Sequence, residues 1–79
     1  MKPLPRWAEG LDWTGWNVYD NGACHEFTDA DDCQHSITIA PSGWFEIVNV
    51  DGEIAWSATF PSVRSAHRAA NAIIEGMKK

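Results

Sequence analysis

The dipeptide Asp51-Gly52 constrains this sequence more than any other feature, because apolar and polar residues alternate on both sides of it. Asp-Gly between such runs is a strong signal for a two-residue β-hairpin, since a type I′ turn needs positive φ at both central positions. That turn would place Ile47 opposite Trp56. One face of the hairpin then carries mostly apolar residues, and we predict that it faces the core: Phe45, Ile47, Ile54, Trp56, Ala58 and Phe60.

A helix is predicted directly after the hairpin. Pro61 and Ser62 suit a helix start, because proline is tolerated in the first turn and a serine hydroxyl can cap a free N–H. Gly76 is expected just beyond the last turn. Apolar residues between them recur at spacings of three and four, which predicts one buried stripe of Val63, Ala66, Ala70, Ile73 or Ile74, and Met77. His67 lies outside that stripe and is expected to be solvated.

The alternation resumes upstream, over residues 35–40. The short connection Pro41-Ser42-Gly43 would place Ile37 opposite Ile47, on the face already assigned to the core. Two weaker strand patterns come earlier and are separated by the turn residues Asp20-Asn21-Gly22.

These elements predict an α+β fold with two layers, an antiparallel meander of three to five strands and a C-terminal helix packed on one face. The clearest strands are 35–40, 44–50 and 53–60. Seventy-nine residues suit a single domain over 1–79, which divides into an N-terminal arm (1–12), the sheet (13–60) and the helix (62–76).

Charge and hydropathy narrow the expected partners. The net charge of −5 disfavours direct binding to nucleic acid, which requires clustered basic residues, and favours a larger protein with a basic surface. No apolar run approaches the ~20 residues that span a bilayer, so no membrane partner is expected. The first residues lack the apolar segment of a signal peptide, and we expect a cytoplasmic protein.

Large side chains are unusually dense near the N-terminus, where Trp7, Leu11, Trp13 and Trp16 fall within ten residues. Our preferred interpretation is that this arm packs on the second face of the sheet and covers Trp44. The alternative is an exposed aromatic patch that anchors a partner, because tryptophan is enriched at binding hot spots.

Two cysteines and two histidines lie within twelve residues, as Cys24-His25 and Cys33-Gln34-His35. A hairpin closed at Thr28–Asp29 would bring Cys24, Cys33 and His35 together, which are ligand types that zinc accepts. A disulfide is the second possibility, although a reducing compartment disfavours it. We favour two free thiols and no cofactor, because the spacing lacks the CxxC or HxxxH pairs of common zinc sites.

The densest acidic region surrounds the expected β-turns and includes Glu26, Asp29, Asp31 and Asp32. It is interpreted either as a solvated loop or as a docking patch for a basic partner. A calcium loop would need the glycine and distal glutamate of an EF-hand, which are missing. Trp44 and Glu46, on the outer side of the hairpin, extend the candidate surface.

The run Trp44-Phe45-Glu46-Ile47-Val48-Asn49-Val50-Asp51-Gly52-Glu53-Ile54, with Phe60-Pro61-Ser62 and the alanine-rich helix, resembles the strand–turn–strand–helix unit of YegP-like small domains. The resemblance covers less than half of the chain and does not extend to Trp56, Pro61 or the tryptophan-rich first half. It implies a fold and no activity. The size, acidity and lack of a catalytic motif are similar to small phage-encoded accessory proteins, including anti-CRISPR inhibitors.

The leading functional hypothesis is a non-enzymatic protein-binding module, an inhibitor of phage type that occludes a basic surface of a host protein in the host cytoplasm. Its expected contacts are Glu26, Asp29, Asp31, Asp32, Trp44 and Glu46. The alternatives are a small zinc protein using Cys24, Cys33 and His35, and a homo-oligomer, for example a homodimer, that buries the second sheet face.

Overall fold

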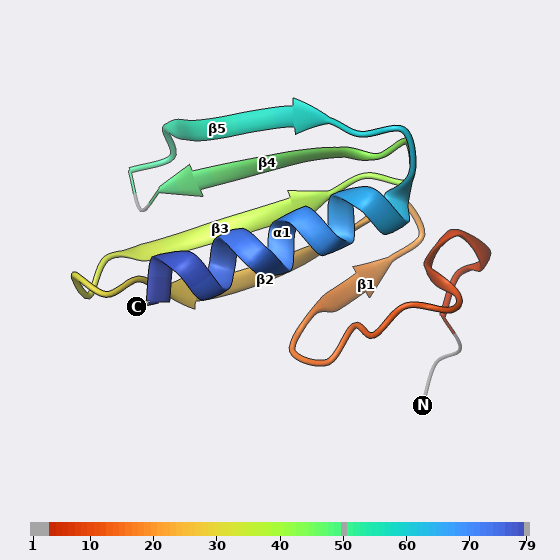
Figure 1. Ribbon diagram of the computed structural model, residues 1–79, viewed down its shortest axis with the longest axis horizontal. Coiled ribbons are helices and arrows are strands. Elements are labelled where there is room, and N and C mark those ends of the chain that lie inside the picture. The colour runs from red at the N-terminus through yellow and green to blue at the C-terminus, as the bar shows by residue number, and fades with distance from the viewer. Residues whose placement is uncertain (1–3, 50, 79) are drawn as a thin grey trace.

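The computed structural model describes residues 4–49 and 51–78. Five antiparallel strands form one sheet in chain order, and one helix packs on it (Figure 1). The predicted α+β meander with a C-terminal helix is confirmed. Val50, placed by prediction at the end of a strand, lies outside the described residues. The elements are the 3-10 turn η1 (Arg6–Ala8), β1 (Asn17–Tyr19), β2 (Gly22–Thr28), β3 (Gln34–Ile39), β4 (Trp44–Asn49), β5 (Ile54–Thr59) and α1 (Val63–Lys78).

The predicted register of β3 against β4 is confirmed. Ile37 pairs with Ile47 and Ile39 pairs with Phe45, so all four side chains lie on one face. Ile37, Ile39 and Phe45 are completely buried, and Ile47 is 2% exposed. This face carries the core, and α1 packs across it against β3 and β4.

The turn between β4 and β5 differs from the expected type I′ turn. The Asn49 side-chain oxygen accepts hydrogen bonds from the N–H groups of Asp51 and Glu53. The Gly52 N–H donates to the Asn49 carbonyl at 3.0 Å. Of Asp51 and Gly52, only Gly52 has positive φ, at 81°. The asparagine side chain therefore organises a longer loop than the dipeptide indicated.

This loop shifts the register of β5. Trp56 still pairs with Ile47, but Val48 pairs with Ile54, which leaves one residue of β5 as a bulge. The prediction that Ile54 and Trp56 are core residues is wrong, because their exposed fractions are 60% and 51%. The bulge moves Ile54 into register with an outer-face residue, and Trp56 lies on a strand beyond the reach of α1 (Figure 1).

The helix begins as predicted and ends later. Ser62 Oγ accepts the Ser65 N–H at 3.2 Å, which is the expected cap. Gly76 lies inside α1, which continues to Lys78, so the prediction that Gly76 ends the helix is wrong. The predicted stripe is confirmed: Ala66, Ala70 and Ile74 are buried and their apolar neighbours pack around them. In the described part of the chain, no helix is long and apolar enough to cross a membrane.

The N-terminal arm packs beside α1 rather than on the opposite face of the sheet, so our preferred interpretation of the arm is wrong. Trp13 is 7% exposed, and its Nε1 donates to the Ala8 carbonyl at 2.8 Å. Its ring lies 4.6 Å from the ring of His67 and 5.4 Å from that of Trp16, centroid to centroid. Trp7 contacts Trp13 edge-on at 5.6 Å. The tryptophans therefore extend the core layer along the helix.

His67 is part of this packing, and the prediction that it is solvated is wrong. Its Nε2 lies 2.7 Å from the Asp12 carbonyl oxygen, which can only accept, so the ring nitrogen donates. The Asn71 amide, one turn later, donates to the His67 carbonyl at 3.0 Å. A histidine thus joins the helix to the arm.

Candidate binding surface

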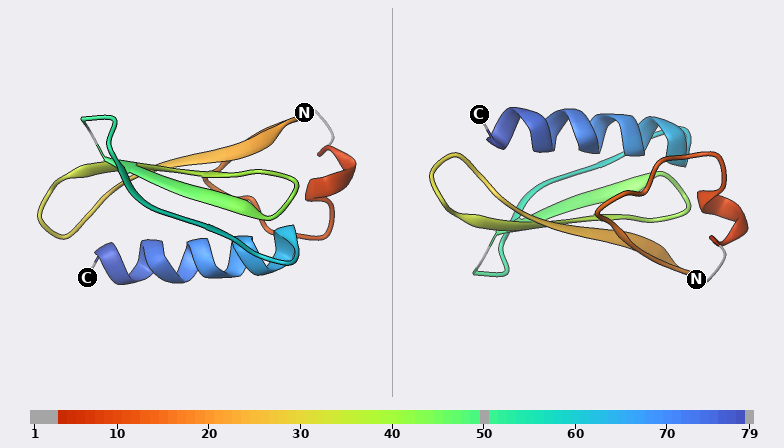
Figure 2. Two further views of the ribbon diagram at one scale, coloured as in Figure 1. Left: turned by 90° about the horizontal axis from the view of Figure 1, so that it is seen from above. Right: turned by 90° about the horizontal axis from the view of Figure 1, so that it is seen from below.

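No other element of the described chain covers the sheet face opposite α1, because the helix and the tryptophans of the arm pack on the same side (Figure 2). We call this the open face. None of its side chains is fully buried, in contrast to the core face. Strand alternation and register assign to it Asn17, Tyr19, Cys24, Glu26, Thr28, Gln34, Ser36, Thr38, Trp44, Glu46, Val48, Ile54, Ser57 and Thr59.

Glu26 and Glu46 are the charged groups of the open face, and Trp44 is its largest side chain. Glu26 pairs with Ser36 across β2 and β3, and Glu46 pairs with Thr38 across β4 and β3. Strand spacing places the two glutamates roughly 12 Å apart. Neither forms an ion pair within the described residues. Trp44, at the start of β4, is half-buried and presents part of its ring on the same face.

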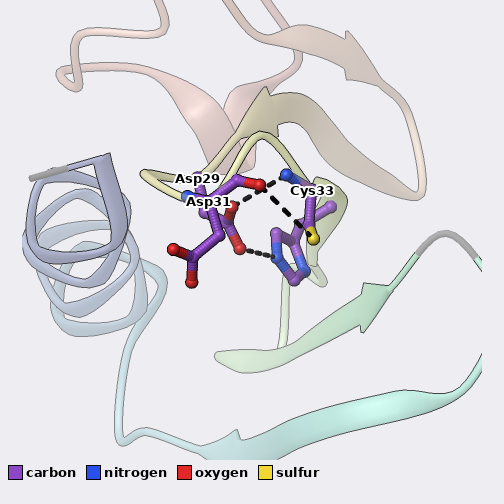
Figure 3. A network of polar contacts seen from close by, with 4 residues as sticks. Asp29, Asp31 and Cys33 are labelled. Atoms are coloured by element: carbon purple, nitrogen blue, oxygen red, sulfur yellow. Dashed lines mark hydrogen bonds and ion pairs between the residues drawn. The ribbon is translucent and has the colours of Figure 1, made fainter.

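The loop between β2 and β3 is built around the carboxylate of Asp29 (Figure 3). Its Oδ1 accepts the N–H groups of Asp31 at 2.9 Å and Cys33 at 2.8 Å. Its Oδ2 lies 2.7 Å from Nε2 of His35. These contacts stabilise the charged carboxylate and lower the pKa of Asp29, with the hydrogen bond from His35 as the largest cause. Asp29, expected to contact a partner, is therefore engaged within its own loop.

The same loop is fixed to the end of the helix. The Ala30 N–H donates to the Met77 carbonyl at 2.8 Å, which satisfies one of the free carbonyls of the last turn. Asp32 adopts the left-handed conformation, with φ of 66°. Asp31 and Asp32 are exposed, and their carboxylates accept no hydrogen bond within the described residues. These two aspartates, rather than Asp29, present free negative charge at the end of the sheet, where the loop meets the last turn of α1.

The alternative of a three-residue zinc site is not supported, because its three side chains are not brought together. Cys24 pairs with Thr38, and the β2–β3 hairpin closes at Thr28 and Gln34, so the register differs from the hairpin closed at Thr28–Asp29. Cys24 therefore lies roughly 13 Å along the strand from the loop that holds Cys33. Cys24 Sγ contacts Ser36 Oγ at 3.3 Å. Both cysteines are free thiols, and among the described residues no three His, Cys, Asp or Glu side chains are grouped to hold a metal.

His35 faces the core side of the sheet, where it stacks on Phe27 at 5.5 Å. Its Nδ1 is buried without a hydrogen-bond partner in the described chain. A hollow of about 190 Å³ lies beside it and is lined by Glu26, Gln34, His35, Ser36 and Asn49. The side chain of His35 therefore serves mainly to orient the Asp29 loop.

Sequence interpretation missed a second surface, on the flank of α1 that faces β5. A groove of about 290 Å³ is lined there by Phe60, Arg64, Ser65, Arg68, Ala69 and Ala72. Periodicity places the arginines outside the apolar stripe. The groove exists because α1 lies to one side of β5, and periodicity does not indicate where a helix lies across a sheet.

Comparisons of the chain with protein-family models, with curated proteins and with solved structures find no match.

Proposed function

We propose that this chain is a non-enzymatic protein-binding module that docks a basic surface of a larger protein on its open face. The observation that carries the proposal is the one-sided architecture: helix and arm share one face, and the other is left to Glu26, Glu46 and Trp44. A sheet face that no element covers is available for a partner, and unpaired carboxylates steer a basic one.

Charge distribution supports a basic partner. The net charge is −5, and Glu26 in β2 precedes the loop that carries Asp31 and Asp32. Acidic groups therefore continue from the sheet to its end. Trp44, at the end of the open face away from that loop, supplies aromatic surface for such an interface.

The same charges disfavour self-association through this face. Two copies related by a two-fold axis would bring Glu26 and Glu46 of one copy toward those of the other, which is repulsive. The proposal therefore selects a different protein as the partner, and the chain acts by occluding that protein's basic surface. For a phage-encoded chain, the partner is a host protein.

The test uses two variants with the same net charge. Glu26→Lys/Glu46→Lys reverses both charges of the open face, whereas Asp51→Lys/Glu53→Lys reverses two exposed charges in the β4–β5 turn. Each raises the net charge from −5 to −1, since every reversal adds two. Proteins captured from a lysate of the cells that carry the gene are quantified on each immobilised variant.

We expect specific partners to be retained by the original chain and by the turn variant, and to be lost with the open-face variant. Equal retention on both variants would show that the open face is not the docking surface. Absence of any specific partner on the original chain would contradict the proposal altogether.

A further inference from the structure

The groove beside α1 is open because small side chains line the helix flank that faces β5. Ser65, Ala69 and Ala72 follow one another at spacings of three and four, so they form one row along that flank. Phe60, just after β5, closes the groove on the sheet side and stacks on Phe45 at 5.3 Å. Gly43 fixes the position of Phe60, because its carbonyl accepts the Phe60 N–H at 2.9 Å.

The strand beside this groove is an unprotected sheet edge. Within residues 4–49 and 51–78, β5 pairs with β4 alone, so every second residue has its backbone N–H and C=O directed away from the sheet. The Phe60 N–H bonds to the β4 side, which assigns the outward groups to Ser57 and Thr59. β5 contains no charged residue and no proline, the usual protections of an edge.

The opposite edge of the sheet is much shorter. β1 has three residues, against six in β5. Trp7 of the arm donates its Nε1 hydrogen to the Asp20 carbonyl beside the end of β1. β5 therefore presents the longest uninterrupted edge of the described sheet that no neighbouring strand or arm contacts.

The charge beside the available edge is positive, in a chain that is acidic overall. Arg64 and Arg68 are exposed, one helical turn apart, and neither forms an ion pair within the described residues. Guanidinium groups bind carboxylates in a two-pronged geometry. Trp56, 51% exposed and edge-on to Phe45, adds an apolar contact on the same face.

We propose that this edge and groove bind an extended acidic segment of a partner protein, which adds to β5 as a sixth strand. Its main chain pairs with the outward groups of Ser57 and Thr59. Its acidic side chains reach Arg64 and Arg68, and an apolar side chain between them covers Trp56. This site uses the outer edge of β5 and the flank of α1, and it does not depend on the function proposed for the open face.

A second copy of the chain fits this edge less well. Antiparallel pairing of β5 with its counterpart would place both helices on the same side of a continuous sheet, so that Arg64 and Arg68 of each copy face those of the other. The charges therefore favour an acidic segment over self-pairing.

The test uses a labelled peptide of about ten residues in which glutamate and valine take turns at every second position, with threonine between them, so that both fall on one face of the added strand; its length matches a long strand. Binding is followed by fluorescence polarisation, and nuclear magnetic resonance locates the perturbed amides. We expect saturable binding, with the largest amide shifts at Ser57 and Thr59. Circular dichroism of each variant verifies its fold.

Two variants separate the contributions. Arg64→Glu/Arg68→Glu is expected to lower the affinity for the acidic peptide by at least about tenfold. The same variant should gain affinity for the peptide with lysine in place of glutamate, because the charge complementarity is reversed. Ser57→Pro removes an outward N–H without removing a bond to β4. It should weaken binding of the acidic peptide to the original chain, and binding of the basic peptide to the arginine variant. Glu26→Lys serves as the control and should leave binding unchanged.

Three results would overturn the proposal. The first is no saturable binding of the acidic peptide at millimolar concentration. The second is equal binding by the arginine variant, and the third is amide shifts confined to residues outside β5 and α1. Sedimentation of the chain alone as a dimer that Ser57→Pro dissociates would assign the edge to a second copy instead.

Discussion

On the flank of α1 that faces β1, His67 and Asn71 meet the tryptophans of the arm, whereas on the flank that faces β5, small residues and arginines border an empty groove. The first flank is closed by Trp13 and Trp16, which meet each other edge to face, and Trp16 stacks on His25. The second is bordered by Phe60 and the half-exposed Trp56. One helix cannot cover five strands, and in this chain Trp7, Trp13 and Trp16 all pack on one side of it.

This difference shows how a small domain can fold and still keep a surface for partners. A chain of 79 residues buries only about 60–65% of its unfolded surface, so its stability depends strongly on each large buried side chain. The arm supplies those side chains on one flank. The other flank is then free to present an edge strand and unpaired arginines.

The sharpest test of the closed flank is Trp13→Ala. Removal of a buried tryptophan that contacts Trp7, Trp16 and His67 should cost about 3–5 kcal/mol of unfolding free energy. That loss is comparable to the whole stability of a domain of this size, so a large unfolded fraction is expected. Urea unfolding followed by circular dichroism measures it. A loss below about 1 kcal/mol would show that the arm does not belong to the core.

The matched substitution on the open flank is Trp56→Ala. The same side chain is deleted, but about half of it is already exposed and its main contact is the edge of Phe45. We expect a loss of about 1–2 kcal/mol, since less apolar area returns to water. If Trp56→Ala destabilises the chain as much as Trp13→Ala, the two flanks contribute equally and the contrast between them fails.

Much of this fold could be predicted from local patterns. Alternation along residues 35–40 and 44–49 determines which residues face the core, and a short connection determines their register. Ser62 marks the start of the helix by a hydrogen bond within four residues. These features depend on neighbours in the sequence, and they were predicted correctly.

The errors concern features that depend on one extra residue or on a distant element. The dipeptide Asp51-Gly52 predicted a turn of two residues. The Asn49 side chain accepts hydrogen bonds from two backbone N–H groups and so makes the turn longer. Asp29 does the same in the β2–β3 loop, which separates Cys24 from Cys33. Side chains that bond to the backbone thus alter the register without altering the hydrophobic pattern.

The candidate surfaces were predictable only in part. Trp44 and Glu46 were assigned to the outer side by alternation alone, whereas the place of Glu26 on that side follows from the observed pairing of β2 with β3. Whether that side is covered depends on where the arm packs, and the spacing of its tryptophans has no period that indicates a face. The groove depends on the lateral position of α1 over the sheet, which no local pattern encodes.

The smallest effect is expected at the far end of α1, where the Asp29 loop joins the helix through Ala30 and Met77. The pKa of Asp29 is lowered below its ordinary value of 3.8, first by the His35 hydrogen bond and then by the Cys33 N–H. A carboxyl with a lowered pKa in the folded chain adds stability that is fully present above its unfolded pKa and is lost as pH falls through the folded one. Stability should therefore decline below about pH 4 in part because of this residue.

Asp29→Asn should remove that part of the decline and lower the stability at neutral pH, because an amide accepts the same N–H groups less strongly. Asp31→Asn removes the same charge two residues later and serves as the control. Urea midpoints of both variants, measured between pH 3 and 7, make the comparison. An acid decline that is as steep in Asp29→Asn as in the original chain would show that the loop contributes nothing to it. The closure of this end of α1 would then depend on backbone contacts alone.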